Sequence, residues 1–438
     1  MKAKVLLIPF VAVAMATTFA SCSSSDDGNG SSSSFSTGDV AGGGNGPAVA
    51  YTSNDLKLKL EATARDLMDK INTADFQEIV DLAEYMDHNN ISGANVNNWA
   101  RSIVESLTNY TGSNVTGLYR ASNFYGEFEA INGSWQKTGE ANHLQFKLNF
   151  NGNSYVLLLT HSGNETPLKI AEDGHDDDSY GRRYDVHREY TIQVPANLHA
   201  SLTKNGASMA ELDVNTSFSQ SGFNFNPQTD RAEANIKANV GQYAFNISRA
   251  VFNPQSNADL SVTFSKGDEK LITANATAAG KMGVRDGEIG LEDAGKANVK
   301  VNVLNGRIIV SGEITNAREF ISFINEASDN KYDEAAYKKA IEEANNRRDV
   351  GIYADNSSAS SATVKLYPFA EENRYGAAAP QRWSAQPVIV FPDGTQYGFE
   401  EYFDQQTFGN VIRKFQQLIQ EFEGLVDDAD SNIYPSYK

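Results

Sequence analysis

The sequence predicts an α+β protein built on a large antiparallel β meander, an open or half-barrel-like sheet that amphipathic helices cover. From Tyr119 to Ile314, apolar and polar residues alternate with a period of two, which is typical of strands that bury one face. Turn signals separate these runs at Gly152-Asn153, Asn205-Gly206 and Asn305-Gly306. Because no crossover helices lie between the runs, neighbouring strands are expected to pair antiparallel.

The N-terminus carries an export signal. Lys2 and Lys4 precede an apolar run of signal-peptide length, which is too short for a membrane-spanning helix. The run ends in Phe19-Ala20-Ser21-Cys22, which is similar to the lipobox of Bacteroidota-type lipoproteins. The resemblance implies that residues 1–21 are a lipoprotein signal peptide and that Cys22 becomes the acylated mature N-terminus. An ordinary secretory signal with a free cysteine nearby is the alternative.

A short acidic pattern follows this cysteine. It resembles the signal that sends Bacteroidota lipoproteins to the outer leaflet of the outer membrane, and it consists of Ser23, Ser24, Ser25, Asp26 and Asp27. The resemblance implies a lipid-anchored protein of the outer membrane that faces the cell surface. Residues 22–50 are rich in Ser and Gly, and we expect them to form a flexible tether.

Helices are expected before and after the strands. Residues 51–112 hold three runs with apolar residues at helical spacing, the first capped by Ser53. Residues 113–315 are assigned to the antiparallel sheet. Residues 316–438 are assigned to helices, an aromatic, loop-rich segment and a C-terminal helix, all packing on the sheet. The pattern leaves open whether the N-terminal helices form a separate domain.

Charge and cysteine content exclude several classes of function. The 438 residues include 37 Lys and Arg against 56 Asp and Glu, a net charge of −19. Nucleic acid is therefore not expected as a partner, because phosphate binding requires clustered basic residues. The single cysteine excludes an internal disulfide, a cysteine-based zinc site and a C-x-x-C redox motif.

Common catalytic signatures are absent from the sequence. None of the six histidines belongs to an H-E-x-x-H helix, and there is no G-x-S-x-G elbow. We therefore expect a protein that is not an enzyme and needs no cofactor. A hydrolase without a recognisable motif is the alternative.

The densest group of ionisable residues suggests a metal site. Carboxylates crowded on a flexible loop suit Ca²⁺, and the candidate ligands are Asp173, Asp176 and Asp178. The alternative is a solvated acidic loop, which an acidic protein is expected to carry.

Aromatic residues gather between Leu366 and Phe403. They are candidates for a platform that stacks on sugar rings or on a partner, formed by Tyr367, Phe369, Tyr375, Trp383 and Tyr397. The alternative is that these rings fix irregular backbone onto the core.

Two predicted strands carry small residues on one face. The alanines are Ala232, Ala234 and Ala238 on one strand and Ala274, Ala276 and Ala278 on another. Either a helix packs against them or they line a concave apolar cavity. A long meander with helices on its concave side is similar in outline to the half-barrel lipoprotein carriers of the LolA/LolB type, an architectural likeness that does not by itself imply a function.

These observations predict a surface-anchored, non-catalytic binding protein. Its ligand would be amphiphilic and lie between sheet and helices, or be a glycan on the aromatic segment. A structural or assembly partner of an outer-membrane protein complex is the second hypothesis, and a hydrolase is the third. In each case the lipid on Cys22 would hold the protein to the membrane.

Overall fold

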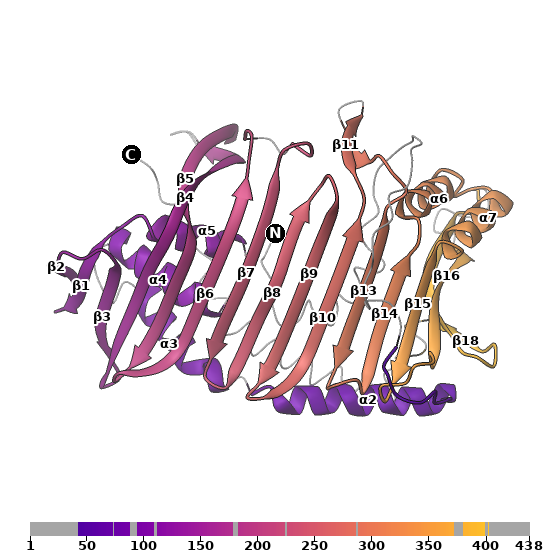
Figure 1. The fold of residues 1–438 in the computed structure, drawn as a ribbon, viewed down its shortest axis with the longest axis horizontal. Helices are drawn as coiled ribbons and strands as arrows, with labels where there is room; N and C mark the ends of the chain where they lie inside the picture. Colours follow the sequence, from indigo (N-terminus) through magenta and orange to yellow (C-terminus); the bar gives the residue numbers. More distant parts are fainter. Residues whose placement is uncertain are drawn as a thin grey trace. The chain divides into compact units, whose positions relative to one another are not determined.

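The computed structural model describes residues 43–72, 74–87, 94–108, 112–177, 183–223, 226–285, 288–371, 380–398 and 402. It confirms the predicted fold class, because sixteen strands form a large, open antiparallel sheet accompanied by a few helices (Figure 1). The chain divides into two compact units. Within the described residues, unit 1 comprises residues 72–253, and unit 2 comprises residues 43–71 together with residues from 254 onward.

Unit 1 contains three helices and eight strands in its described part. The helices are α3 (Ala74–Asp87), α4 (Ala94–Thr108) and α5 (Gly112–Ala121). The strands are β1 (Gly126–Ile131), β2 (Ser134–Gly139), β3 (Leu144–Phe150), β4 (Asn153–Asp177), β5 (Arg183–Lys204), β6 (Ala207–Ser219), β7 (Arg231–Val240) and β8 (Tyr243–Asn253). Their order is β2-β1-β3-β4-β5-β6-β7-β8, and the pairs are antiparallel except for β1 with β3.

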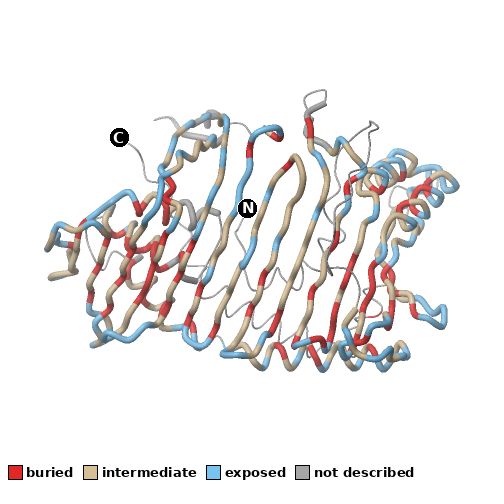
Figure 2. Tube along the Cα trace, in the orientation of Figure 1, coloured by how far each residue is buried: buried red, intermediate tan, exposed pale blue. Residues whose placement is uncertain are grey.

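One face of the unit 1 strands is buried beneath helices. Leu144, Phe146 and Leu148 are buried along β3 and alternate with less buried residues, and Figure 2 shows buried positions recurring along the neighbouring strands. The ring of Phe146 contacts the rings of Phe128 and Trp135. Helix α4 packs on β4 to β7 and α5 packs on β5. The amphipathic helices therefore cover this face, as their apolar spacing predicts.

Unit 2 contains three helices and ten strands in its described part. The helices are α2 (Ser53–Lys70), α6 (Ala317–Asp329) and α7 (Glu334–Asn345). The sheet strands are β9 (Asn257–Lys266), β10 (Glu269–Ala279), β13 (Lys296–Val303), β14 (Ile308–Ile314), β15 (Arg348–Ala354), β16 (Ala362–Ala370), β17 (Trp383–Val390) and β18 (Gln396–Gly398), while β11 (Met282–Arg285) and β12 (Glu288–Leu291) form a separate hairpin. The sheet order is β9-β10-β13-β14-β15-β16-β17-β18.

Helices lie at both ends of the unit 2 strands (Figure 1). Helix α2 runs across the ends where β9 turns into β10 and β13 into β14, and we call this the α2 end. Helices α6 and α7 lie at the opposite end, which we call the α6 end. Two clusters of buried apolar residues accompany them. The first joins Leu56 of α2 to strands β14 to β17, and the second joins α6 and α7 to β16 and β17.

Tight turns set the strand register. The predicted turns Asn205-Gly206 and Asn305-Gly306 are confirmed, with φ values of 50° and 83° and of 55° and 92°. The first predicted turn lies one residue earlier, at Asn151-Gly152, where φ is 48° and 76°. The correction has a simple cause, because a two-residue hairpin turn of this type needs positive φ at both positions and Asn followed by Gly meets that need best.

The N-terminal helices differ from the prediction in number and cap. A fourth helix, α5, occupies residues assigned to the sheet, so the first strand begins at Gly126. Its buried residues Leu118, Tyr119 and Ala121 pack toward the core at helical spacing. Helix α2 is capped by Thr52 instead of Ser53, since the Thr52 hydroxyl accepts a hydrogen bond from the backbone N–H of Asp55.

The segment expected to be loop-rich consists largely of strands. Residues 362–370 and 383–390 form β16 and β17, and a short β18 follows the Asp393-Gly394 turn. The aromatic and β-branched residues of this segment favour strands. Pro368 and Pro387 have no backbone N–H to donate to a neighbouring strand, so their presence argues against strands when the sequence is read alone. The predicted signal peptide at residues 1–21 and the C-terminal helix lie outside the described residues.

Candidate functional site

Helix α2 ties together the hairpin turns at its end of unit 2. Its apolar side faces the sheet, and Leu56, Thr63 and Leu67 are buried on it. The Thr63 hydroxyl donates to the Lys59 carbonyl one turn earlier, which satisfies this buried polar group within the helix. The side of α2 that faces the turns carries alternating charges at positions 59, 66 and 70.

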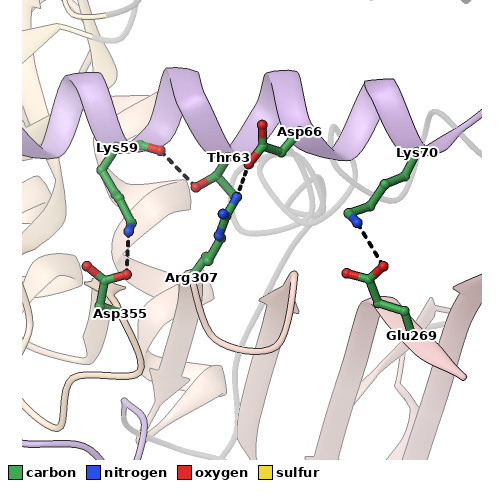
Figure 3. A network of polar contacts seen from close by, with 7 residues as sticks. All are labelled: Lys59, Thr63, Asp66, Lys70, Glu269, Arg307 and Asp355. Carbon is green, nitrogen blue, oxygen red and sulfur yellow. Dashed lines mark hydrogen bonds and ion pairs between the residues drawn. The ribbon is translucent and has the colours of Figure 1, made fainter.

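Three ion pairs join α2 to three successive turns (Figure 3). Lys59 pairs with Asp355, Asp66 pairs with Arg307, and Lys70 lies 2.8 Å from Glu269. The hydrogen bond from Arg307 lowers the pKa of Asp66. Each pair is partly exposed and contributes at most about 1 kcal/mol, so the three together fix the position of α2 more than they stabilise the fold.

A small hollow lies beside these pairs. Its volume is about 330 Å³, and its lining residues are Asp66, Asp69, Lys70, Glu269, Leu304 and Arg307. Five of the six residues are charged, three of them negatively and two positively. This lining does not suit a lipid-like ligand, and we interpret the hollow as a consequence of the way α2 spans the turns.

The two faces of the unit 2 sheet have opposite character. Register places Leu260, Ala276, Val299 and Gly312 across β9, β10, β13 and β14 on one face, which we call the inner face. The same face carries the residues that pack against Leu56. The opposite positions are Ser261, Asn275, Lys300 and Ser311, and we call this polar side the outer face.

The predicted aromatic platform does not form as one surface. Tyr367 and Phe369 lie on the outer face of β16, whereas Trp383 and Tyr397 lie on the inner face. Trp383 packs against α7, where Lys338 lies over its ring, and Tyr397 contacts Phe391 and Tyr402. These two rings therefore belong to the core, and Tyr375 lies outside the described residues. The cause of the correction is strand alternation, which sends neighbouring aromatics to opposite faces.

An exposed aromatic patch remains on the outer face, formed by Tyr367, Phe369 and Gln386. Tyr367 is 50% exposed, and Phe369 is half-buried two residues further along β16. Gln386 lies directly opposite Tyr367 on β17 and is exposed. An aromatic ring beside an amide offers an apolar surface together with a hydrogen-bond donor and acceptor. No local pattern indicates Gln386, because its place beside Tyr367 depends on the pairing of β16 with β17.

The acidic run is strand at its start instead of a loop. Asp173 and Asp176 lie within β4, where their backbones pair with His187 and Tyr184 of β5. Their side chains and the whole of Asp178 lie outside the described part of the chain. Among the described residues there is no group of three or more His, Cys, Asp or Glu side chains that could hold a metal ion. An extended strand does not wrap around Ca²⁺ as the predicted loop would, so the loop is corrected, and the metal site stays a prediction.

The predicted alanine-bearing strands are β7 and β10. On β7, Ala238 is buried, Ala234 is half-buried and Ala232 is exposed. On the inner face of β10, Ala274 and Ala276 are half-buried and Ala278 is exposed. Leu260 of β9 pairs with Ala276 and is 37% exposed. The inner face of β9 and β10 thus presents apolar surface, with the largest exposed side chain at Leu260.

Among the described residues, a histidine and an aspartate form a close pair on the sheet of unit 1. Nδ1 of His199 lies 2.7 Å from Oδ1 of Asp213, across the β5–β6 ladder. Both side chains are exposed by more than a third. Within the described residues, no hydroxyl or thiol is hydrogen-bonded to His199, so this pair has no nucleophile to activate.

No protein-family model, curated protein or solved structure matches this chain.

The residues predicted for lipidation and export lie outside the described part of the chain. These are Cys22, Ser23, Ser24, Ser25, Asp26 and Asp27. In the part that is described, no helix combines the length and the apolar character needed to cross a bilayer. The lipid anchor stays a prediction from the lipobox.

Proposed function

We propose that this protein is a lipid-anchored protein of the outer membrane, facing the cell surface, that binds a neutral glycan without catalysing a reaction. The observation that supports a glycan ligand is the exposed patch of Tyr367, Phe369 and Gln386 on the outer face. The anchor rests on the resemblance of residues 19–27 to a lipobox and its acidic export signal.

The chemistry of the patch suits a sugar ring. The face of an aromatic ring packs on the apolar C–H face of a pyranose, and an adjacent amide can both donate to and accept from the sugar hydroxyls. Tyr367 and Gln386 occupy opposed positions of paired strands, where side chains lie within about 5 Å of each other at their Cβ atoms. Because both strands belong to a hydrogen-bonded sheet, little ordering is needed before binding.

The charge of the protein narrows the class of glycan. Its net charge is −19, and loss of residues 1–21 would remove two lysines and make the chain more negative. A polyanionic glycan would be repelled during its approach, whereas a neutral one would not. We therefore expect neutral polysaccharides to bind better than uronate-rich or sulfated ones.

Substitution of Tyr367 tests the patch. We expect the Tyr367→Ala variant to lose about tenfold in affinity, since losing a stacked ring costs about 1 to 2 kcal/mol, and 1.4 kcal/mol corresponds to a factor of ten. The measurement is affinity electrophoresis of the full mature chain in native gels that contain soluble starch, mixed-linkage β-glucan, xylan or galactomannan. Polygalacturonate and heparin serve as the anionic comparison.

The matched control is Tyr332→Ala. Tyr332 is 56% exposed, and it lies in the turn between α6 and α7, outside the paired strands β16 and β17 that carry the patch. This variant should be retarded by the gels as strongly as the wild type. Equal retardation of both variants, or free migration of the wild type in every neutral polysaccharide, would contradict the proposal.

A second candidate ligand is an amphiphile on the inner face of unit 2. The observation that favours it is the exposed side chain of Leu260 beside the alanines of β10. Single exposed apolar residues are common, but this one continues a run of apolar positions across neighbouring strands. An acyl chain lying there would be removed from water along Ala276 and Val299.

Mass spectrometry of an organic-solvent extract distinguishes the two candidates. If an amphiphile occupies the inner face, the purified mature chain should release one at close to one molecule per protein. The Leu260→Asp variant should then release much less, whereas Tyr367→Ala should release the same amount. An extract without any amphiphile would count against this candidate and leave the glycan as the ligand.

A further inference from the structure

Residues 43–50, which we call the strap, lie against the turn between β15 and β16 instead of forming a flexible tether. The backbone N–H groups of Gly44 and Gly46 donate to the carbonyls of Ser357 and Asn356, each at 2.7 Å. Nζ of Lys300, on the outer face of β13, donates to the Gly43 carbonyl at 2.7 Å. Gly46 and Ser357 also form a parallel β-bridge. The end of the Gly-rich segment is therefore fixed to unit 2.

Glycine is required in the strap for lack of space. A Cβ atom on Gly46 would lie 2.7 Å from the Asn356 carbonyl oxygen. Cβ atoms on Gly43 and Gly44 would lie closer still to Ser357 and Asn356. None of the three glycines has a positive φ. The glycine cluster thus permits a close approach of two backbones, which its composition alone does not distinguish from a flexible linker.

The strap continues directly into the α2 network. The Tyr51 hydroxyl donates to Asp355, and that hydrogen bond raises the pKa of Tyr51 to about 12. Asp355 also pairs with Lys59 of α2, and Thr52 caps the helix. Ser357, whose hydroxyl accepts from the N–H of Val49, is completely buried. Residues 43–59 are therefore held at the α2 end of unit 2 by contacts along their length.

We propose that the strap holds the α2 end of unit 2 toward the lipid surface. This inference rests on the proposed lipidation of Cys22 and names the edge of the protein that the anchor brings to the membrane. With residues 43–50 fixed, residues 23–42 remain to connect the lipid to unit 2. Twenty residues of this composition span about 25 Å on average. Strand β10 alone is eleven residues long, which corresponds to about 35 Å. The α6 end is therefore held farther from the bilayer than the α2 end.

Energy transfer to labelled lipid tests this orientation. The lipidated full chain is placed in phosphatidylcholine vesicles that contain rhodamine-labelled phosphatidylethanolamine, with a donor dye on a single introduced cysteine. Asp268→Cys labels the exposed β9–β10 turn at the α2 end, and Tyr332→Cys labels the α6–α7 turn at the other end. Transfer from position 268 should be at least twice that from position 332. Equal transfer from both positions would overturn the orientation.

A strap variant and a matched control complete the test. Gly44→Val should reduce the difference between the two positions, because the released strap lengthens the tether by eight residues, from about 25 to about 29 Å on average. Gly38→Val places the same side chain within residues 23–42 and should leave the difference unchanged. If Gly44→Val also leaves it unchanged, the strap does not set the orientation.

Hydrogen exchange separates the strap from the lipid. In the non-lipidated Cys22→Ser chain, the amides of Gly44 and Gly46 should exchange slowly, and Gly44→Val should make them exchange at least a hundredfold faster. Rapid exchange in the parent chain would overturn the strap whatever the state of Cys22. If the strap is protected but the full chain that keeps Cys22 does not attach to vesicles, the lipid anchor is contradicted, and so is the orientation that depends on it. The proposal for the glycan patch would be unaffected.

Discussion

Replacing Leu56 by alanine is expected to lower the free energy of unfolding of unit 2 by about 2 to 5 kcal/mol. Leu56 is completely buried and packs within the cluster formed by Ile308, Ile352, Ile389 and Tyr402. Removing most of its side chain leaves a cavity between α2 and four strands, which the rigid sheet cannot close. Urea unfolding followed by far-ultraviolet circular dichroism measures the loss.

Leu58→Ala is the matched control for this prediction. Leu58 lies two residues further along the same helix and is 51% exposed. The substitution changes helix propensity by the same amount as Leu56→Ala, so the difference between the two variants reports burial alone. Leu58→Ala should change stability by less than about 0.5 kcal/mol. Similar losses for the two variants would mean that α2 is not packed on the sheet as described.

The sheet could be predicted because its signals are local. Alternation along Leu144 to Phe150 indicates a strand with one buried face, and Asn205-Gly206 indicates a hairpin, without knowledge of any distant residue. Strands β16 and β17 were missed because two prolines lie among their aromatic residues. The helix α5 was missed because its short, glycine-containing sequence carries few apolar residues before Leu118.

The candidate site was only partly predictable, because it depends on pairing between distant segments. Tyr367 and Phe369 could be named from composition, but the face that they share follows from recognising β16 as a strand. Gln386 joins them through the register of β16 with β17. The ion pairs of α2 connect residues about 200 to 300 positions apart, since Lys70 pairs with Glu269 and Lys59 with Asp355. No local pattern encodes such partners.

The strap also depends on a distant partner that no local sequence pattern encodes. Residues 43–46 have the composition of a flexible linker, and glycine serves both flexible linkers and close backbone approach. Only the partner decides between these roles, and Val49 and Ser357 are 308 positions apart. Composition therefore predicted a flexible segment at residues 43–46, whereas in the fold these residues pack against the turn between β15 and β16.

Replacing Asn97 by alanine is expected to destabilise unit 1 by about 2 to 4 kcal/mol, because it removes a buried amide that joins three elements. The Asn97 side chain donates to the Met86 carbonyl near the end of α3, and it accepts from the indole N–H of Trp135 on β2 at 3.1 Å. Asn97 is 7% exposed and Trp135 is 8% exposed, so water cannot freely replace the lost partner. Each polar group left without that partner costs about 1 to 3 kcal/mol.

A double-mutant cycle separates the hydrogen bond from packing. Asn98→Ala, at the exposed neighbouring position, should change the free energy of unfolding by less than about 0.5 kcal/mol. Trp135→Phe removes the indole N–H, so the cost of Asn97→Ala should fall by at least about 1 kcal/mol in that background. Strictly additive losses in the double variant would show that Asn97 stabilises unit 1 by filling space and not by satisfying Trp135. The coupling therefore tests whether this amide holds α3, α4 and β2 in register beneath the sheet.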